Sequence, residues 1–255
     1  MAAWLGRRYG LIGIACALAL WQLTTGLGLL GPQFSDALSP ALAVGAFIQL
    51  VATGALVENA LPSLQRVGVG LAVAIAIGIP TGLAVGFDPK VEKSTYVIFQ
   101  FLRMVSPLAW MPIAIVALGV GDAPVYFLVA IAAVWPIIIN TAHGTSQVDR
   151  AWVRMAKTLG AGTKEVFSRV VVPAVIPDML MGLRVALGVS WVILVPAEML
   201  GVSSGLGYYI LDTRDRFAYS ELVAVILAIG AIGFALDSVL RRLRARFNWK
   251  AAEEQ

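Results

Sequence analysis

Three charged side chains inside long apolar stretches are the residues of this sequence most able to do chemistry. Arg103, Arg184 and Glu198 each interrupt a run of hydrophobic residues. Ionisable groups in such surroundings are costly, and they usually pair with an opposite charge or line a pathway for polar solutes. The arginines could attract a small anion, or they could bond carbonyls freed by nearby prolines or anchor a loop. Glu198 could be a gate that pairs and parts, or it could cap a short helix.

Several other kinds of site are excluded by composition. The chain has one cysteine, Cys16, and one histidine, His143, and no cluster of metal-ligand residue types. A phosphate-binding Gly-x-x-x-x-Gly-Lys-Ser/Thr loop is absent, because the nearest approach, at 160–164, lacks the spacing. No serine lies in a Gly-x-Ser-x-Gly elbow. The sequence therefore predicts no catalytic residue, metal or cofactor in this chain, and no ATP hydrolysis.

The elements that position the charged residues are predicted to be membrane-spanning helices. The 255 residues are 59% hydrophobic and only 13% charged, with a mean hydropathy of +0.85. A bilayer core takes about 20 apolar helical residues to cross, and backbone groups in lipid must be paired internally. Six stretches meet this requirement: Leu11–Leu30, Val67–Val85, Thr95–Leu118, Ala123–Asn140, Met179–Leu200 and Leu222–Leu240.

Basic residues indicate how these spans are oriented, because positively charged loops stay in the cytoplasm. With the N-terminus inside, the cytoplasmic segments hold 14 of the 19 Lys and Arg residues, and the outer loops hold Arg66, Arg214 and Arg216. Both chain ends are therefore expected in the cytoplasm, with an even number of spans. The uncharged stretch Ala41–Val57 could be a seventh span, but we favour a helix along the outer surface.

Two local patterns concern how the spans pack. Gly78, Gly82 and Gly86 repeat at four-residue spacing, which lets helix backbones approach closely. Pro107 and Pro112 are expected to break the third span. Broken membrane helices are tolerated where they are buried or line a cavity, so the break is compatible with a pathway between helices.

The sequence between the fourth and fifth spans predicts two short cytoplasmic helices. Asp149 is a plausible N-cap of the first, and Gly160 supplies a left-handed stop. Thr163 is expected to cap the second helix, and Pro173 to end it.

One face of the first short helix is apolar. Trp152, Met155, Ala156 and Leu159 are spaced to form a single stripe, while basic residues line another face. Such a helix could lie on anionic lipid or could dock against a partner protein. The periodicity does not choose between the two.

A longer sequence pattern favours one of these two alternatives, docking against a partner protein. Residues 154–161 read Arg-Met-Ala-Lys-Thr-Leu-Gly-Ala, and eight residues later Val170-Val171-Val172-Pro173 follows. This segment resembles the EAA loop of permeases in binding-protein-dependent ABC importers, in which Glu-Ala-Ala is followed by three residues, Gly, and later Ile-x-Leu-Pro. Ala156, Gly160, Ala161 and Pro173 match, whereas Arg154 and Met155 depart from the pattern.

Further motifs resemble the nitrate/sulfonate/taurine-type branch of that family. They are 102–112 in the third span, Pro177 with Gly182-Leu183-Arg184, Ala197-Glu198-Met199-Leu200, and Ser204-Gly205-Leu206-Gly207. The resemblance extends over about Leu61–Leu240. It implies an all-α membrane protein of the type I ABC importer kind, formed by one transmembrane permease domain over residues 1–255.

The resemblance also implies the partners and the location. The permease would form a homodimer in the bacterial inner membrane, with two ATPase subunits that carry ATP and Mg²⁺, an extracytoplasmic solute-binding protein, surrounding lipid and no nucleic acid. The coupling loop, 149–173, would sit in a groove on the ATPase. Its docking residues would be Trp152, Met155, Ala156, Leu159, Gly160, Ala161, Thr163 and Pro173.

The resemblance implies import of a small anion such as a sulfonate, taurine or nitrate, with Arg103, Arg184 and Glu198 as pathway candidates. A gradient-driven secondary transporter is the alternative, but such proteins usually show internal repeats and intramembrane carboxylates. Here no clear repeat is evident, and Glu198 is the main candidate carboxylate.

Overall fold

The computed structural model describes residues 2–28, 31 and 38–247, and all regular secondary structure among these residues is helical. Contacts divide the chain into two units. One comprises residues 1–61 and 204–231, and the other 62–203 and 232–255. The predicted all-α fold is confirmed.

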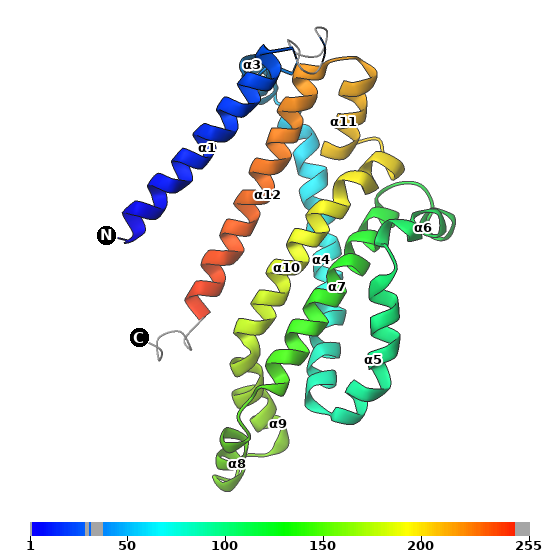
Figure 1. Ribbon diagram of the computed structural model, residues 1–255. Helices are drawn as coiled ribbons and strands as arrows, with labels where there is room; N and C mark the ends of the chain where they lie inside the picture. The colour runs from blue at the N-terminus through cyan, green and yellow to red at the C-terminus, as the bar shows by residue number, and fades with distance from the viewer. Residues whose placement is uncertain (1, 29–30, 32–37, 248–255) are drawn as a thin grey trace. The chain divides into compact units, whose positions relative to one another are not determined.

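The first unit contains α1 (Ala2–Gly26), α3 (Pro40–Ala52), the start of α4, α11 (Leu206–Asp215) and the start of α12 (Figure 1). The apolar part of α1 described at side-chain level, Ile12–Gly26, is shorter than a bilayer span. Residues 29–30, the predicted end of the first span, lie outside the described residues. The count of six spans therefore stays a prediction.

The surface helix expected at Ala41–Val57 corresponds to α3. Ser39 caps it through a hydrogen bond from the Leu42 amide to the Ser39 hydroxyl, and Pro40 begins it. With 13 residues α3 is about 20 Å long, which is too short to cross a bilayer core of about 30 Å. Its place along a membrane surface stays a prediction.

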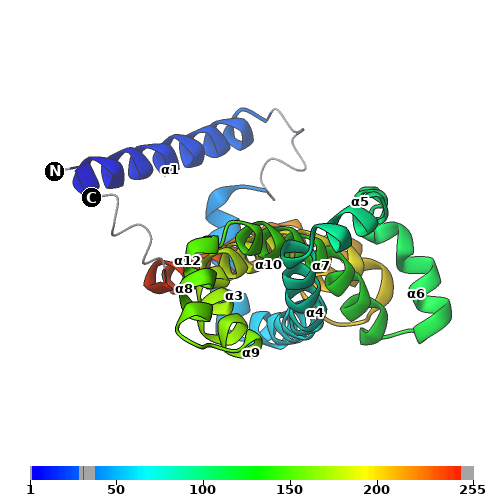
Figure 2. The same cartoon turned by 90° about the horizontal axis from the view of Figure 1, so that it is seen from below.

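In the described part of the chain, four helices are long and apolar enough to cross a membrane. They are α4 (Ala55–Phe87), α7 (Asp122–Ser146), α10 (Val172–Gly201) with the turns before it, and α12 (Tyr219–Phe247). Within the second unit α4, α7 and α10 run side by side, as the views of Figures 1 and 2 both show. Each contains one of the predicted spans and extends beyond it.

The predicted third span is a broken one. Helix α5 (Pro89–Met104) is capped by Val105, and after a short 3-10 turn (Pro107–Trp110) the chain continues as α6 (Met111–Leu118). The two helical parts meet at 84°. Ser106, with φ of −59° and ψ of 127°, lies outside the helical region, as expected of the residue that directly precedes Pro107. With this pair counted as one span, the described residues contain up to five.

Small residues on α4 form a close seam with α7, as the glycine spacing predicted. A Cβ atom at Gly78 would lie 2.8 Å from Ile137 Cγ2, and one at Gly82 would lie 2.6 Å from Thr141 Cβ. A Cβ at Gly86 would overlap the backbone of α7. Because nothing larger than glycine fits, these positions set the distance between the two helices.

Candidate functional site

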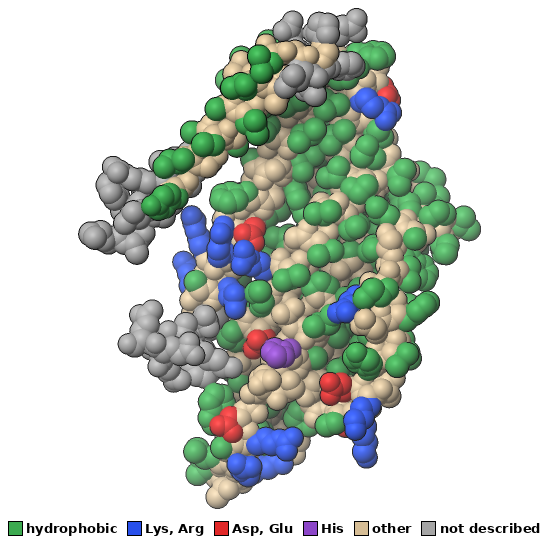
Figure 3. Space-filling model, in the orientation of Figure 1, with side chains coloured by type: hydrophobic (Ala, Val, Ile, Leu, Met, Phe, Trp, Pro, Cys, Tyr) green, Lys and Arg blue, Asp and Glu red, His purple; other side chains and the backbone are tan. Residues whose placement is uncertain are grey.

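The apolar stripe between the fourth and fifth predicted spans lies on α8 (Arg150–Thr158). Asp149 caps this helix, because its carboxylate accepts a hydrogen bond of 2.7 Å from the Ala151 amide. Arg150, Arg154 and Lys157 fall on another face than the apolar stripe. Figure 3 shows Lys and Arg side chains gathered at this end of the second unit, over α8 and the start of α5.

Gly160 ends α8 with a left-handed turn, as predicted. Its φ is +86°, its amide donates to the Lys157 carbonyl at 3.0 Å, and the Ala161 amide donates to the Ala156 carbonyl at 3.0 Å. These two bonds are those of a Schellman motif, in which the left-handed residue satisfies the last carbonyls of the helix. The glycine therefore directs the chain from α8 back toward α10.

A groove of about 410 Å³ lies between α8 and the start of α10. Met155 and Leu159, on its rim, are 64% and 81% exposed. This exposed groove is the candidate interaction surface of the segment. The groove is lined by Trp152, Met155, Ala156, Leu159, Arg169, Val170, Pro173 and Ala174.

Two local predictions in this segment were wrong. Thr163 is the first residue of α9 (Thr163–Val166), and its N-cap is Gly162, whose amide donates to the Glu165 carboxylate at 3.2 Å. Pro173 does not end a helix, because a π-helical stretch (Phe167–Val171) leads directly into α10. The wider π turn accommodates the proline, whose ring would otherwise clash within a continuous α-helix.

Glu198 lies in a buried ion cluster at one end of the second unit. Its Oε1 is 2.6 Å from Arg66 Nη1, and the Ser63 hydroxyl donates to the same carboxylate at 2.8 Å. Arg66 also donates through Nε to Asp122 at 2.8 Å. Glu198 and Ser63 are fully buried and Arg66 is 3% exposed, whereas Asp122 is half-exposed. The cluster joins α4, α7 and α10.

Arg184 forms a two-pronged ion pair with Asp237. The Nε–Oδ1 distance is 2.6 Å and the Nη2–Oδ2 distance is 3.2 Å, so the guanidinium engages both carboxylate oxygens. Arg241 approaches the same carboxylate at 3.4 Å. The pair joins α10 to α12, and the charge of Arg184 is compensated.

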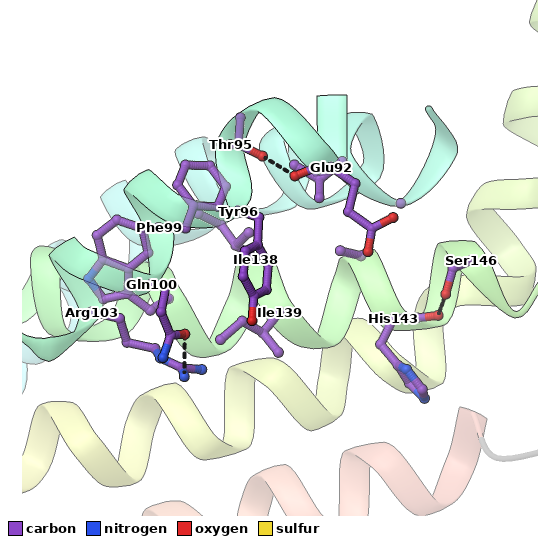
Figure 4. A pocket seen from close by; sticks show the side chains of 14 residues that line it. Glu92, Thr95, Tyr96, Phe99, Gln100, Arg103, Ile138, Ile139, His143 and Ser146 are labelled. Carbon is purple, nitrogen blue, oxygen red and sulfur yellow. Dashed lines mark hydrogen bonds between the residues drawn. The ribbon is translucent and has the colours of Figure 1, made fainter. Parts of the chain in front are cut away.

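Arg103 faces a cavity of about 400 Å³ between α5 and α7. Its Nη2 donates to the Gln100 amide oxygen at 2.9 Å. In Figure 4, Arg103 and Gln100 lie at one end of the cavity, Glu92 and His143 at the other, and Tyr96 and Phe99 between them. None of the ion pairs found in the described part of the chain includes Arg103.

The three pathway candidates thus lie in three different environments. Sequence reasoning missed the partners Asp237 and Arg66. Asp237 carries a signal that could have been used, since it is the one charge in the predicted span Leu222–Leu240 and an intramembrane carboxylate demands a partner. Arg66 directly precedes the predicted second span, so its position in the sequence indicates a loop residue.

Among residues 2–28, 31 and 38–247, no group of three or more His, Cys, Asp or Glu side chains could hold a metal ion.

Comparison with known proteins places these features in a family. Residues 74–249 match the family described as binding-protein-dependent transport system inner membrane component. The bicarbonate transport system permease protein CmpB of Synechocystis sp. is 37% identical over 235 residues, covering 89% of this chain and 84% of that protein. The nitrate import permease protein NrtB of the same organism is 35% identical over 183 residues, covering 72% and 66%.

A solved structure shares the fold. A chain from inward-facing conformations of the MetNI methionine ABC transporter superposes with a TM-score of 0.63. The sequences are 15% identical, and the match covers 76% of this chain and 96% of that one.

Proposed function

The chain belongs to the family of binding-protein-dependent transport system inner membrane components, and we propose that it is the membrane-spanning subunit of an ATP-driven importer for a small anion. The observation that carries the proposal is the exposed apolar groove beside α8, a helix that ends at Gly160. The family resemblance implies that this segment is the coupling loop. The relatives named for bicarbonate and nitrate support an anionic solute.

The groove on α8 is the proposed contact with the ATPase. The helix α8, with its apolar stripe, its basic face and its left-handed end, is a compact projection that could fit into a groove on a partner protein. Exposed Met155 and Leu159 would supply most of the apolar contact area. ATP and Mg²⁺ would bind to the ATPase, and closure of two ATPases would carry the α8 segments of two permeases with it.

This arrangement requires α8 to be cytoplasmic. The distribution of basic residues favours that topology, in which both chain ends lie on the cytoplasmic side of a bacterial plasma membrane. The solute-binding protein would then dock on the opposite side, at the end of the second unit that contains the Arg66–Glu198 cluster.

The exposed helix α5 is the proposed contact with a second copy of the permease. No residue of α5 is buried, and Arg103 is exposed close to the bend at Val105. An uncompensated guanidinium cannot face lipid at low cost, so it must face a water-filled cavity or another protein chain. A homodimer with α5 near its axis satisfies this requirement and places Arg103 along the solute path.

Arg184 and Glu198 would act in the pathway indirectly. Each is neutralised by a partner and holds α10 against a neighbouring helix, α12 in one case and α4 in the other. Their proposed role is to keep α10 in place as a wall of the path, while Arg103 attracts the anion.

Reconstitution into liposomes with the ATPase and the solute-binding protein tests the proposal. Uptake of labelled nitrate, bicarbonate or a sulfonate should require ATP on the side of the membrane that carries the ATPase and the binding protein on the opposite side. Uptake that follows an imposed sodium or proton gradient without ATP would instead identify a secondary transporter.

A matched pair of variants tests the docking surface. Leu159→Asp places a charge on the rim of the groove and should abolish co-purification with the ATPase. Thr158→Asp introduces the same charge one residue earlier, at an exposed position that does not line the groove, and should leave the complex intact. Equal loss in both variants would exclude the groove as the contact.

A further inference from the structure

The cavity between α5 and α7 has opposite chemical character at its two ends. Arg103 and Gln100 form a cationic, hydrogen-bonding end, and Glu92 forms an acidic end (Figure 4). Between them, aromatic and branched apolar side chains line the walls. The cavity therefore offers one place for an anion and a longer apolar surface beside it.

Among the arginines at or within the predicted spans that the structure describes, Arg103 is the one found in no ion pair. Arg66 and Arg184 each bind a carboxylate at 2.6 Å, and Arg241, which directly follows the last predicted span, lies 3.4 Å from Asp237. Arg103 is hydrogen-bonded to a neutral amide instead. A guanidinium has five N–H donors and binds acid groups in a two-pronged geometry, so several donors remain for a bound anion.

The size of the cavity argues against a simple oxyanion as its full occupant. Its volume of about 400 Å³ lies in the range of roughly 300–1,000 Å³ typical of sites for organic ligands. Glu92 and Arg103 are eleven residues apart, which is about 16 Å along a helix. Nitrate or bicarbonate, with four non-hydrogen atoms each, would engage the arginine end and leave the rest of the cavity unfilled.

The walls favour an apolar, flat body. Tyr96 and Phe99 come from α5 and Trp135 from α7, and the Phe99 and Trp135 rings meet edge to face with centroids 5.6 Å apart. Aromatic side chains supply large contact areas and prefer stacked or edge-to-face neighbours. Glu92 at the far end disfavours a second negative charge on the ligand.

We propose that this cavity is a binding site of the permease for an organic monoanion, whose sulfonate or carboxylate group binds Arg103 and Gln100 while its apolar body lies against Tyr96, Phe99 and Trp135. The inference rests on the proposed function, because it places the cavity on the path that the solute takes through the permease. It assigns the permease a substrate preference of its own, in addition to that of the solute-binding protein.

Titration of the purified complex of full-length permease and ATPase with 4-toluenesulfonate and with nitrate tests the proposal. Trp135 lines the cavity, so toluenesulfonate should quench a component of the tryptophan fluorescence that is lost in Trp135→Phe. Calorimetry on the same samples should give an affinity for toluenesulfonate at least about tenfold higher than for nitrate.

Two variants and a control locate the binding. Arg103→Gln should weaken toluenesulfonate binding by about tenfold or more, and Arg103→Lys should retain part of it, because the charge remains. Lys93→Gln removes a charge from the same helix at a position that does not line the cavity, and should bind as the wild type does. Equal binding by Arg103→Gln and wild type would overturn the assignment.

The outcomes separate this inference from the proposed function. ATP-dependent uptake of nitrate by a complex that does not bind toluenesulfonate would leave the importer assignment standing and refute the organic-anion site. Binding of toluenesulfonate that depends on Arg103, in a complex without ATP-dependent uptake of any anion, would support the site and refute the importer assignment.

Discussion

Arg66 and Glu198, which are 132 residues apart in the chain, form a buried ion pair that joins α4 to α10. Glu198 is fully buried, and Ser63 and Arg66 surround its carboxylate. Asp122 binds the same guanidinium but is 49% exposed at its side chain. Arg66 thus binds the buried carboxylate of Glu198 and the half-exposed carboxylate of Asp122.

The difference between the two carboxylates leads to a prediction for stability. Glu198→Gln leaves Arg66 buried without its main counter-charge and should lower the free energy of unfolding by about 3–5 kcal/mol. Asp122→Asn removes a half-exposed partner and should cost less than about 1 kcal/mol. Thermal unfolding of the purified variants measures both, and equal losses would contradict the assigned burial.

The left-handed residue Gly160 should be required for coupling. Its φ of +86° costs a residue with a Cβ atom about 1–2 kcal/mol, although a side chain there would meet nothing within 4 Å. Gly160→Val should therefore leave the permease inserted but weaken ATPase association and stop transport. Gly162→Val is the matched control, because Gly162 has an extended backbone with φ of −68° and equally open surroundings.

Loss of the Arg184–Asp237 pair should lower the stability of the permease and its transport activity together. Arg184→Gln leaves Asp237 with only the more distant Arg241, so melting temperature and solute flux should both fall. Adding Asp237→Asn removes the unpaired charge and should restore much of the melting temperature. A loss of flux at unchanged stability would instead place Arg184 in direct contact with the solute.

The glycine seam between α4 and α7 should tolerate no added methyl group. Gly86→Ala would drive Cβ into the backbone of α7 and should destabilise the permease by about 1–3 kcal/mol. Gly68→Ala lies on the same helix with nothing within 4 Å of the added atom, and should be neutral or slightly stabilising. Thermal unfolding in detergent distinguishes the two, and equal melting temperatures would argue against the seam.

Topology can be measured by labelling single cysteines in a Cys16→Ser background. A membrane-impermeant reagent added to intact cells should modify Val120→Cys, because Val120 is 85% exposed at the turn before α7. It should not modify Thr163→Cys, which lies in the α8–α9 segment proposed to be cytoplasmic. Modification of Thr163→Cys from outside would invert the proposed orientation.

The sequence by itself determined the features that depend on local chemistry. The all-helical class follows from apolar stretches in which every backbone group must be paired within its own segment. The stop at Gly160 and the cap at Asp149 each depend on a few neighbouring residues, and both are present in the structure. The spacing of Gly78, Gly82 and Gly86 likewise indicated a close helix contact before its partner helix was known.

Only the tertiary structure decided which charges meet. Arg184 pairs with Asp237 and Glu198 with Arg66, and no local pattern encodes either choice, because the partners lie on helices far apart in the chain. The same holds for the cavity beside Arg103, whose second wall is provided by Trp135 and its neighbours on α7. Local sequence specifies where helices begin and end, whereas the register between packed helices selects the partner of each buried charge and places Arg103 at the cavity beside α7.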